Sequence, residues 1–171
     1  TSATTALWLC LKRLDIGPGD EVVVSDFSFP ATANVVEDLG ARPVFADVSL
    51  ETYNMLPEAL EAAITPRTKA VIAVDAFGNP TGMGRIAEMC RARGIPLIED
   101  AACAIGSSEH GKRCGAIADM TCFSFHPRKL LTTGEGGAIT IHNPDWVDWF
   151  NRKLSHGAQG MLGYGLDFVD Y

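Results

Sequence analysis

Short apolar segments alternate with helical patterns along almost the whole chain, and this order restricts the possible folds more than any other feature of the sequence. The strand patterns cover residues 21–25, 42–46, 69–74, 96–99, 120–125 and 137–141, and the helical patterns cover residues 4–14, 30–39, 57–64, 83–93 and 144–154. Strands in β-α-β order pair in parallel, with helices on both faces of the sheet. We therefore predict an α/β fold, a three-layer α/β/α sandwich with a mostly parallel sheet.

Composition and charge exclude several classes of function. The chain has 171 residues, of which 47% are hydrophobic, enough for one domain with a single core. Its net charge of −7 argues against a nucleic-acid surface, and no apolar run approaches the roughly 20 residues of a membrane helix. The five cysteines form no CxxC pair, and the histidines lack metal-ligand spacing. We expect a cytoplasmic protein without a metal site, a membrane span or a nucleic-acid partner.

Four segments follow directly after predicted strands. They are residues 26–29, 75–78, 100–103 and 124–129. In open α/β sheets, ligands bind at the carboxyl ends of the strands, so we expect these segments to converge on a binding site.

Two of these segments carry a pair of residues with specific chemistry. Lys129 lies between an apolar strand pattern and a glycine-rich turn, and Asp100 lies at the end of an earlier strand pattern. Pyridoxal phosphate (PLP) chemistry needs one amine that forms a Schiff base and one carboxylate that keeps the pyridine nitrogen protonated. The alternatives are an ordinary surface lysine and an aspartate that caps a helix beginning at Ala101.

Six sequence landmarks in fixed order resemble one family. They are SATTAL (2–7), GPGDEV (17–22), FSFPATAN (27–34), AITPRTKA (63–70), EDAA (99–102) and FSFHPRK (123–129) with its glycine turn. Together they resemble the DegT/DnrJ/EryC1/StrS sugar aminotransferases, which belong to the fold-type I PLP enzymes. The resemblance runs from Ser2 to about Gly157 and implies the large domain of these transferases.

The resemblance implies two catalytic residues. Lys129 matches the lysine that forms the Schiff base and then moves the proton between two carbon atoms. Asp100 matches the acid that pairs with the pyridinium nitrogen. The presence of the lysine argues against the dehydratase branch of the family, in which it is replaced.

The resemblance also implies residues that bind the cofactor besides Lys129 and Asp100. Ser124 matches a phosphate-binding hydroxyl, and Thr4 and Thr5 match a phosphate-binding pair at a helix N-terminus. Phe29 matches the aromatic residue that stacks on the pyridine ring. Cys103 stands where family members commonly carry glutamine or histidine beside that ring, and a thiol is a poorer hydrogen-bond partner.

The implied activity is transfer of an amino group from glutamate or glutamine to a keto group of a nucleotide-activated sugar, in a homodimer with shared active sites. We expect residues 1–155 to form the cofactor-binding large domain without its N-terminal extension. Residues 156–171 would begin the connection to a smaller C-terminal domain. Two alternatives stay open: another fold-type I PLP enzyme, such as a lyase or decarboxylase, and a truncated, non-catalytic piece that binds the cofactor.

Overall fold

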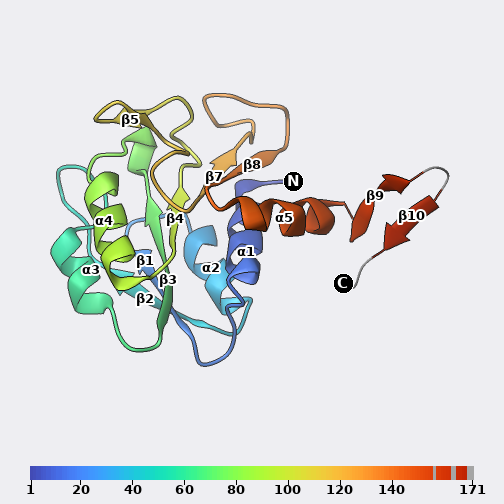
Figure 1. Cartoon of the computed structure of the whole chain (residues 1–171). Helices are drawn as coiled ribbons and strands as arrows, with labels where there is room; N and C mark the ends of the chain where they lie inside the picture. Colours follow the sequence, from blue (N-terminus) through green and yellow to red (C-terminus); the bar gives the residue numbers. More distant parts are fainter. Residues whose placement is uncertain (156, 163–164, 169–171) are drawn as a thin grey trace.

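A six-stranded sheet forms the centre of the structure, a computed structural model that describes residues 1–155, 157–162 and 165–168 (Figure 1). In spatial order its strands are β2 (Arg42–Ala46), β1 (Glu21–Ser25), β3 (Thr68–Val74), β4 (Leu97–Asp100), β7 (Met120–Ser124) and β8 (Gly137–Ile141). The first five run parallel, and β8 at the edge runs antiparallel to β7. The prediction of a mostly parallel sheet is confirmed.

Helices cover both faces of this sheet. On one face lie α1 (Ala3–Arg13), α2 (Ala31–Glu37) and α5 (Val147–Leu154), and on the other lie α3 (Pro57–Ala63) and α4 (Met83–Arg93) (Figure 1). The predicted three-layer α/β/α sandwich is therefore present.

The side chains of β1 show that the two faces of the sheet contribute to two separate hydrophobic clusters. Val22 and Val24 belong to the cluster under α1 and α2, whereas Val23 belongs to the cluster under α3 and α4. All three are fully buried. Successive residues of a strand point to opposite faces, and both faces here are covered by helices. For this reason the central strands are continuous apolar runs in the sequence.

The last predicted helix, residues 144–154, begins with a different kind of turn. Pro144–Trp146 form a 3-10 turn (η2), and the Oδ1 of Asn143 accepts a hydrogen bond from the N–H of Asp145 at 3.0 Å. The α-helix α5 follows this turn. β4 also differs from the prediction, because it continues through Asp100 and thereby holds this residue in the sheet.

A short hairpin that the sequence did not predict covers the N-terminus of α4. It consists of β5 (Ser108–Glu109) and β6 (Lys112–Arg113). The carboxylate of Glu109 accepts hydrogen bonds from the N–H groups of Gly82 at 2.6 Å and Gly84 at 2.7 Å. N–H groups at a helix start lack partners within the helix, and the helix dipole favours a negative charge there. The carboxylate therefore caps α4 from a distant part of the sequence.

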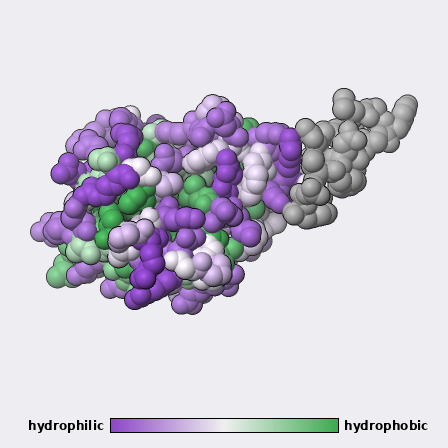
Figure 2. Space-filling model, turned by 60° about the horizontal axis from the view of Figure 1, so that its bottom comes forward, coloured by the Kyte–Doolittle hydropathy of each residue, from purple (hydrophilic) through white to green (hydrophobic). Residues whose placement is uncertain are grey.

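The described surface is mixed in character. On the face that Figure 2 brings forward, most of the surface is hydrophilic, and the hydrophobic residues lie in separated patches. None of the helices in the described part of the chain combines the length and the apolar character that a membrane crossing requires.

Two further strands, β9 (Ala158–Leu162) and β10 (Gly165–Phe168), pair antiparallel near the end of the chain. The domain boundary predicted at residue 156 lies outside the described residues. The assignment of residues 156–171 to a connection between domains stays a prediction.

Two acidic side chains are buried beside each other at the ends of β3 and β4. Asp75 is 1% exposed and Glu99 is fully buried, and both lie close to the thiol of Cys114. Oε2 of Glu99 accepts hydrogen bonds from the hydroxyl of Thr121 at 2.6 Å and from the N–H of Gly115 at 2.9 Å. Among the described residues, the oxygens of Asp75 and Oε1 of Glu99 are buried without a hydrogen bond of ordinary geometry, and the side chains of Glu99 and Cys114 are the polar groups near Asp75. Burial, and then the negative charge of Glu99, raises the pKa of Asp75 to about 9.

We expect the stability of the cofactor-free protein to fall as the pH rises from about 4 to about 9. In this window the folded chain keeps a proton on Asp75, whereas the unfolded chain, with an aspartate pKa of about 4, releases it. Asp75 alone therefore lowers the free energy of unfolding by up to about 1.4 kcal/mol per pH unit. Urea denaturation at a series of pH values measures this slope.

The Asp75→Asn variant should show a flatter slope, because the amide does not titrate. Asp38→Asn, at the exposed end of α2, serves as the matched control and should keep the slope of the parent protein. An unchanged slope in Asp75→Asn would assign the pH dependence to another group.

The first residue of β8, Gly137, packs closely against the start of α1. A Cβ atom on Gly137 would lie 2.7 Å from the carbonyl carbon of Ser2 and 2.8 Å from its oxygen. We expect Gly137→Ala to destabilise the protein by about 1–3 kcal/mol, the usual cost of overpacking, because the start of α1 must move. Gly17→Ala is the control, since nothing lies within 4 Å of its Cβ position. Thermal unfolding of both variants tests this, and equal melting temperatures would contradict it.

Candidate active site

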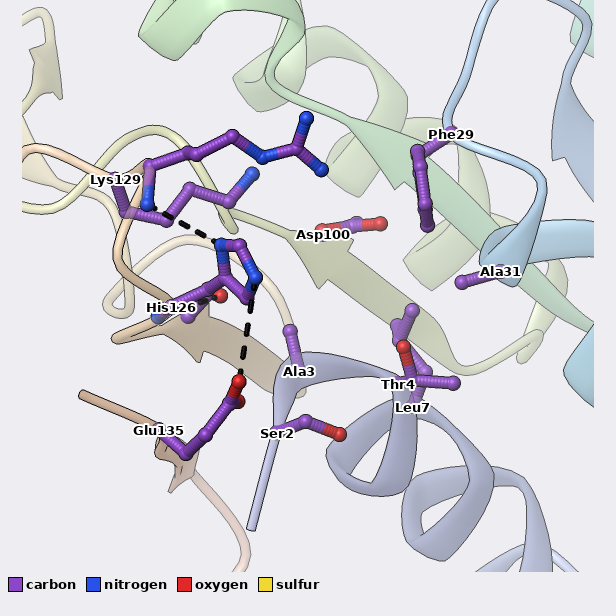
Figure 3. A pocket seen from close by; sticks show the side chains of 12 residues that line it. Ser2, Ala3, Thr4, Leu7, Phe29, Ala31, Asp100, His126, Lys129 and Glu135 are labelled. Atoms are coloured by element: carbon purple, nitrogen blue, oxygen red, sulfur yellow. Dashed lines mark hydrogen bonds and ion pairs between the residues drawn. The ribbon is translucent and has the colours of Figure 1, made fainter. Parts of the chain in front are cut away.

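A cavity of about 460 Å³ opens beside the N-terminus of α1 and the carboxyl ends of the strands (Figure 3). Its lining residues come from segments far apart in the sequence: Ser2, Ala3, Thr4, Leu7, Phe29, Ala31, Asp100, Ser124, His126, Arg128, Lys129 and Glu135.

Most of the site residues predicted from the sequence meet in this cavity. Lys129, Asp100, Ser124, Thr4 and Phe29 all line it. The two other predicted residues, Thr5 and Cys103, are not among the lining residues.

The loops after β1, β3, β4 and β7 converge as expected. The ring centroids of Phe27, after β1, and Phe77, after β3, are 5.8 Å apart. The loop after β3 also packs closely on the loop after β4, because a Cβ atom on Gly78 would lie 2.6 Å from the carbonyl oxygen of Cys103. Lys129, after β7, in turn donates a hydrogen bond to the sulfur of Cys103. The parallel strands thus bring the four loops together.

Asp100 presents a buried carboxylate to the cavity. It is 6% exposed, and its Oδ1 accepts a hydrogen bond from the N–H of Ala102 at 3.1 Å. Its Oδ2 accepts a hydrogen bond from the hydroxyl of Thr32, also at 3.1 Å. Burial raises the pKa of Asp100 above its ordinary value, while these two hydrogen bonds and the charge of Lys129 act in the opposite direction. A cation beside this carboxylate would favour its ionised form and so act against the effect of burial.

Lys129 lies in the turn that follows β7. Its N–H donates to the carbonyl oxygen of His126 at 2.9 Å, which closes the turn. Its side chain is half-buried, and its Nζ donates a hydrogen bond to the Sγ of the exposed Cys103 at 3.1 Å. The structure therefore places Cys103 against the amine of Lys129. The thiol thus contacts a residue that lines the cavity, although Cys103 itself is not among the lining residues.

The start of α1 orients the two predicted threonines differently. Ser2 is the N-cap residue, and its Oγ accepts a hydrogen bond from the N–H of Thr5 at 3.1 Å. The hydroxyl of Thr5 lies 3.1 Å from that of Ser2 and 3.3 Å from that of Thr1. Thr5 thus belongs to the cap, whereas Thr4 lines the cavity. The first N–H groups of the helix and the positive end of its dipole suit a bound anion.

An exposed aromatic ring and a buried hydroxyl complete the predicted set. Phe29 is 71% exposed, and Figure 3 shows Asp100 between Phe29 and Lys129. Ser124, at the end of β7, is 6% exposed, and its Oγ accepts a hydrogen bond from the N–H of His126 at 3.4 Å. An aromatic side chain left this exposed gains contact area when a planar ligand packs against it.

Sequence reasoning missed three charged or polar residues of the lining. Nδ1 of His126 accepts a hydrogen bond from the N–H of Arg128 at 3.2 Å, and its Nε2 lies 4.0 Å from Oε1 of Glu135 (Figure 3). Arg128 adds a second positive charge next to Lys129. Arg128 could have been found from the sequence, because it directly precedes Lys129 in the same turn. The contact between His126 and Glu135 could not, because it depends on the path of the glycine turn.

Ser2 was also missed, although its sequence context indicates its role. A serine directly before a helical pattern is a typical N-cap. The same short segment therefore holds the cap and the residue that lines the cavity.

The cavity combines four chemical properties. It holds a half-buried amine, a buried carboxylate, an exposed aromatic ring and a helix N-terminus with hydroxyl groups. An amine can attack an aldehyde, a carboxylate can stabilise a cation, and a helix N-terminus can bind an anion. These are the groups that a phosphorylated pyridine aldehyde requires.

Known proteins resemble this chain in sequence and in structure. The chain is 44% identical over 163 residues to dTDP-4-dehydro-2,3,6-trideoxy-D-glucose 4-aminotransferase from Saccharopolyspora spinosa, covering 95% of this chain and 42% of the relative. The aminotransferase TlmJ from Streptoalloteichus hindustanus superimposes with a TM-score of 0.94 at 37% identity, covering 99% of this chain and 46% of TlmJ.

A third relative is known in two cofactor forms. A protein from Streptococcus pneumoniae, described as a sugar aminotransferase, has been solved in a PLP form and a PMP form. Both superimpose with a TM-score of 0.87 at 35% identity and cover 99% of this chain and 48% of that protein.

The chain spans less than half of the length of these relatives. The sequence pattern of the DegT/DnrJ/EryC1/StrS aminotransferase family matches residues 1–164. With the sheet, the cavity and these similarities in agreement, the chain belongs to the DegT/DnrJ/EryC1/StrS aminotransferase family.

Proposed function

We propose that this protein is a PLP-dependent aminotransferase that moves an amino group from glutamate or glutamine to a keto group of a nucleotide-activated sugar. The observation that carries the proposal is the presence of the Lys129 amine and the buried Asp100 carboxylate in one cavity. Family membership and the sugar substrate in the name of the Saccharopolyspora relative support the choice of acceptor.

The residues of the cavity fit the cofactor. Asp100 would pair with the pyridine nitrogen, and Phe29 would cover one face of the ring. Ser124, Thr4 and the first turn of α1 would hold the phosphate. When bound, PLP supplies an aldehyde and a ring that accepts electrons.

Lys129 would have two tasks in this reaction. Its Nζ would hold the cofactor covalently, and once released would take a proton from one carbon atom and deliver it to a second carbon atom. The Cys103 thiol contacts this amine, so it would lie beside the ring at the position where the family commonly has glutamine or histidine. Lys129 itself lines the cavity, so its amine would reach a bound cofactor directly.

Amino transfer itself is tested with glutamate and a nucleotide keto sugar. One 2-oxoglutarate should form for each amino sugar produced, since the amino group is the only group transferred. Binding of PLP without transfer, for any donor and acceptor pair, would favour a lyase, a decarboxylase or a non-catalytic cofactor-binding piece.

We also propose a homodimer in which neighbouring subunits share active sites, with residues 1–155 as its large domain. Three exposed aromatic rings support an interface beside the cavity. The ring centroids of Phe27, Tyr53 and Phe77 are 5.0–5.8 Å apart, and Phe77 is 77% exposed. Clustered exposed aromatic residues are typical of protein interfaces. Sedimentation of the parent and of Phe77→Ser tests this, and a monomeric parent would overturn it.

The compartment that we propose is the cytoplasm. All five cysteines are free thiols. Free thiols are typical of reducing compartments. Trapping of thiols in intact cells with a membrane-permeant reagent would test this proposal, and disulfides at these positions would contradict it.

We expect borohydride reduction of the protein with PLP to leave a covalent adduct on Lys129. The amine is half-buried and lines the cavity, where the cofactor aldehyde would reach it. Lys129→Ala should lose both the adduct and amino transfer, by several orders of magnitude for the transfer. Visible absorbance and peptide mapping by mass spectrometry provide the measurement.

Lys69→Ala is the matched control for this experiment. Lys69 is exposed and lies 3.4 Å from Asp20 at the start of β3, away from the cavity. This variant should keep the adduct. An adduct on any other lysine, or an unchanged adduct in Lys129→Ala, would show that the role assigned to Lys129 is wrong.

A further inference from the structure

A threonine from α2 contacts the carboxylate of Asp100 from the side of the helix. Thr32 is 1% exposed, and its Oγ1 donates a hydrogen bond to Oδ2 of Asp100 at 3.1 Å. The hydroxyl of Ser28 lies 2.6 Å from the same Oγ1. Ser28 and Thr32 thus form a chain of two hydroxyls that ends at the acid.

The direction of the protons in this chain follows from simple counting. A hydroxyl has one proton, and Thr32 gives its proton to the carboxylate, which is an acceptor. The short contact between the hydroxyls then uses the proton of Ser28, with Oγ1 of Thr32 as its nearer acceptor at 2.6 Å and the carbonyl oxygen of Phe29 as a second, farther acceptor at 3.1 Å. The O–H dipole of Thr32 points toward Asp100, and that of Ser28 points mainly toward Thr32. Hydrogen bonds in such a chain polarise and strengthen one another.

The same two residues connect the acid to the aromatic side of the cavity. The Oγ of Ser28 also lies 3.1 Å from the carbonyl oxygen of Phe29. Phe29, which precedes α2, lines the cavity opposite Lys129 (Figure 3). The first turn of α2 thus holds the loop of Phe29 and the carboxylate of Asp100 in one hydrogen-bonded unit.

We propose that Ser28 and Thr32 are positioning residues that fix the orientation of the Asp100 carboxylate and favour its ionised form. This inference rests on the proposed function, because it concerns the role of Asp100 toward the cofactor. Ser28 and Thr32 do not line the cavity, so they act through Asp100.

The surroundings of Asp100 explain why the acid needs this support. Burial opposes its ionisation, and Lys129 is the cation that faces it. Asp75, on the loop after β3, and Cys122, on β7, also lie close enough to interact with its charge. Burial disfavours the charged carboxylate, whereas the hydrogen bonds donated by Thr32 and by the N–H of Ala102 stabilise it.

Titration of the cofactor-free protein gives a direct test. In Thr32→Val, the shape of the side chain is kept and the donor is lost. Asp100 should therefore titrate at a higher pH than in the parent protein. Carbon-13 NMR of the aspartate carboxyl groups measures this, and Asp100→Asn identifies the signal. A role in packing alone would leave this pKa unchanged.

Two further variants distinguish loss of the hydrogen bond from a general effect on folding. Thr32→Ser retains the hydroxyl and should restore the titration of the parent. Ser28→Ala, at a half-buried site, removes only the outer hydroxyl and should shift the titration in the same direction by less. An unchanged titration of Asp100 in both Thr32→Val and Ser28→Ala would overturn the proposal.

Cofactor binding separates failure of this inference from failure of the proposed function. We expect Thr32→Val to weaken PLP binding about tenfold or more, as expected for a lost hydrogen bond to a charged group. In an Asp100→Asn background, the same change should have little further effect. If Asp100→Asn impairs binding and transfer but Thr32→Val does not, the positioning role is wrong. If Asp100→Asn behaves as the parent, the proposed role of Asp100 itself is wrong.

Discussion

The common direction of the five parallel strands is the constraint on which the candidate active site depends. Since β1, β3, β4 and β7 all end at one edge, loops separated by many residues meet there. The helices that bury both faces of the sheet leave this edge as the place where polar side chains can collect. Asp75, Glu99 and Asp100 all lie at this edge and are buried from solvent. Three buried acidic side chains are therefore concentrated there.

The parts of the fold with regular periodicity could be predicted from the sequence. The β-α-β order required a mostly parallel sheet, and the position of Lys129 and Asp100 after strand patterns placed them at the same edge. The roles of Phe29 and Ser124 came from family resemblance, because an aromatic residue or a serine in such a pattern is usually part of the core. The structure brings these residues to one cavity, while their roles stay predictions.

Other features depend on contacts that no local pattern records. The hairpin of β5 and β6 has strands of only two residues, too short for a periodic signal. The hydrogen bond from Thr32 to Asp100 joins residues 68 positions apart. The difference between Thr4 and Thr5 arises from their directions in the first helical turn, where adjacent residues point about 100° apart. The antiparallel direction of β8 goes with a connection after β7, residues 125–136, that contains no crossover helix.

The close packing at Gly78 has a consequence for how this site can change. Its left-handed backbone, with φ of 84°, fits against the carbonyl oxygen of Cys103, and the Oγ of Ser107 donates to the Gly78 carbonyl at 2.7 Å. The backbone around residue 103 is therefore fixed against the loop after β3 by main-chain contacts. We expect a different side chain at position 103, beside Lys129, to leave the path of the main chain unchanged.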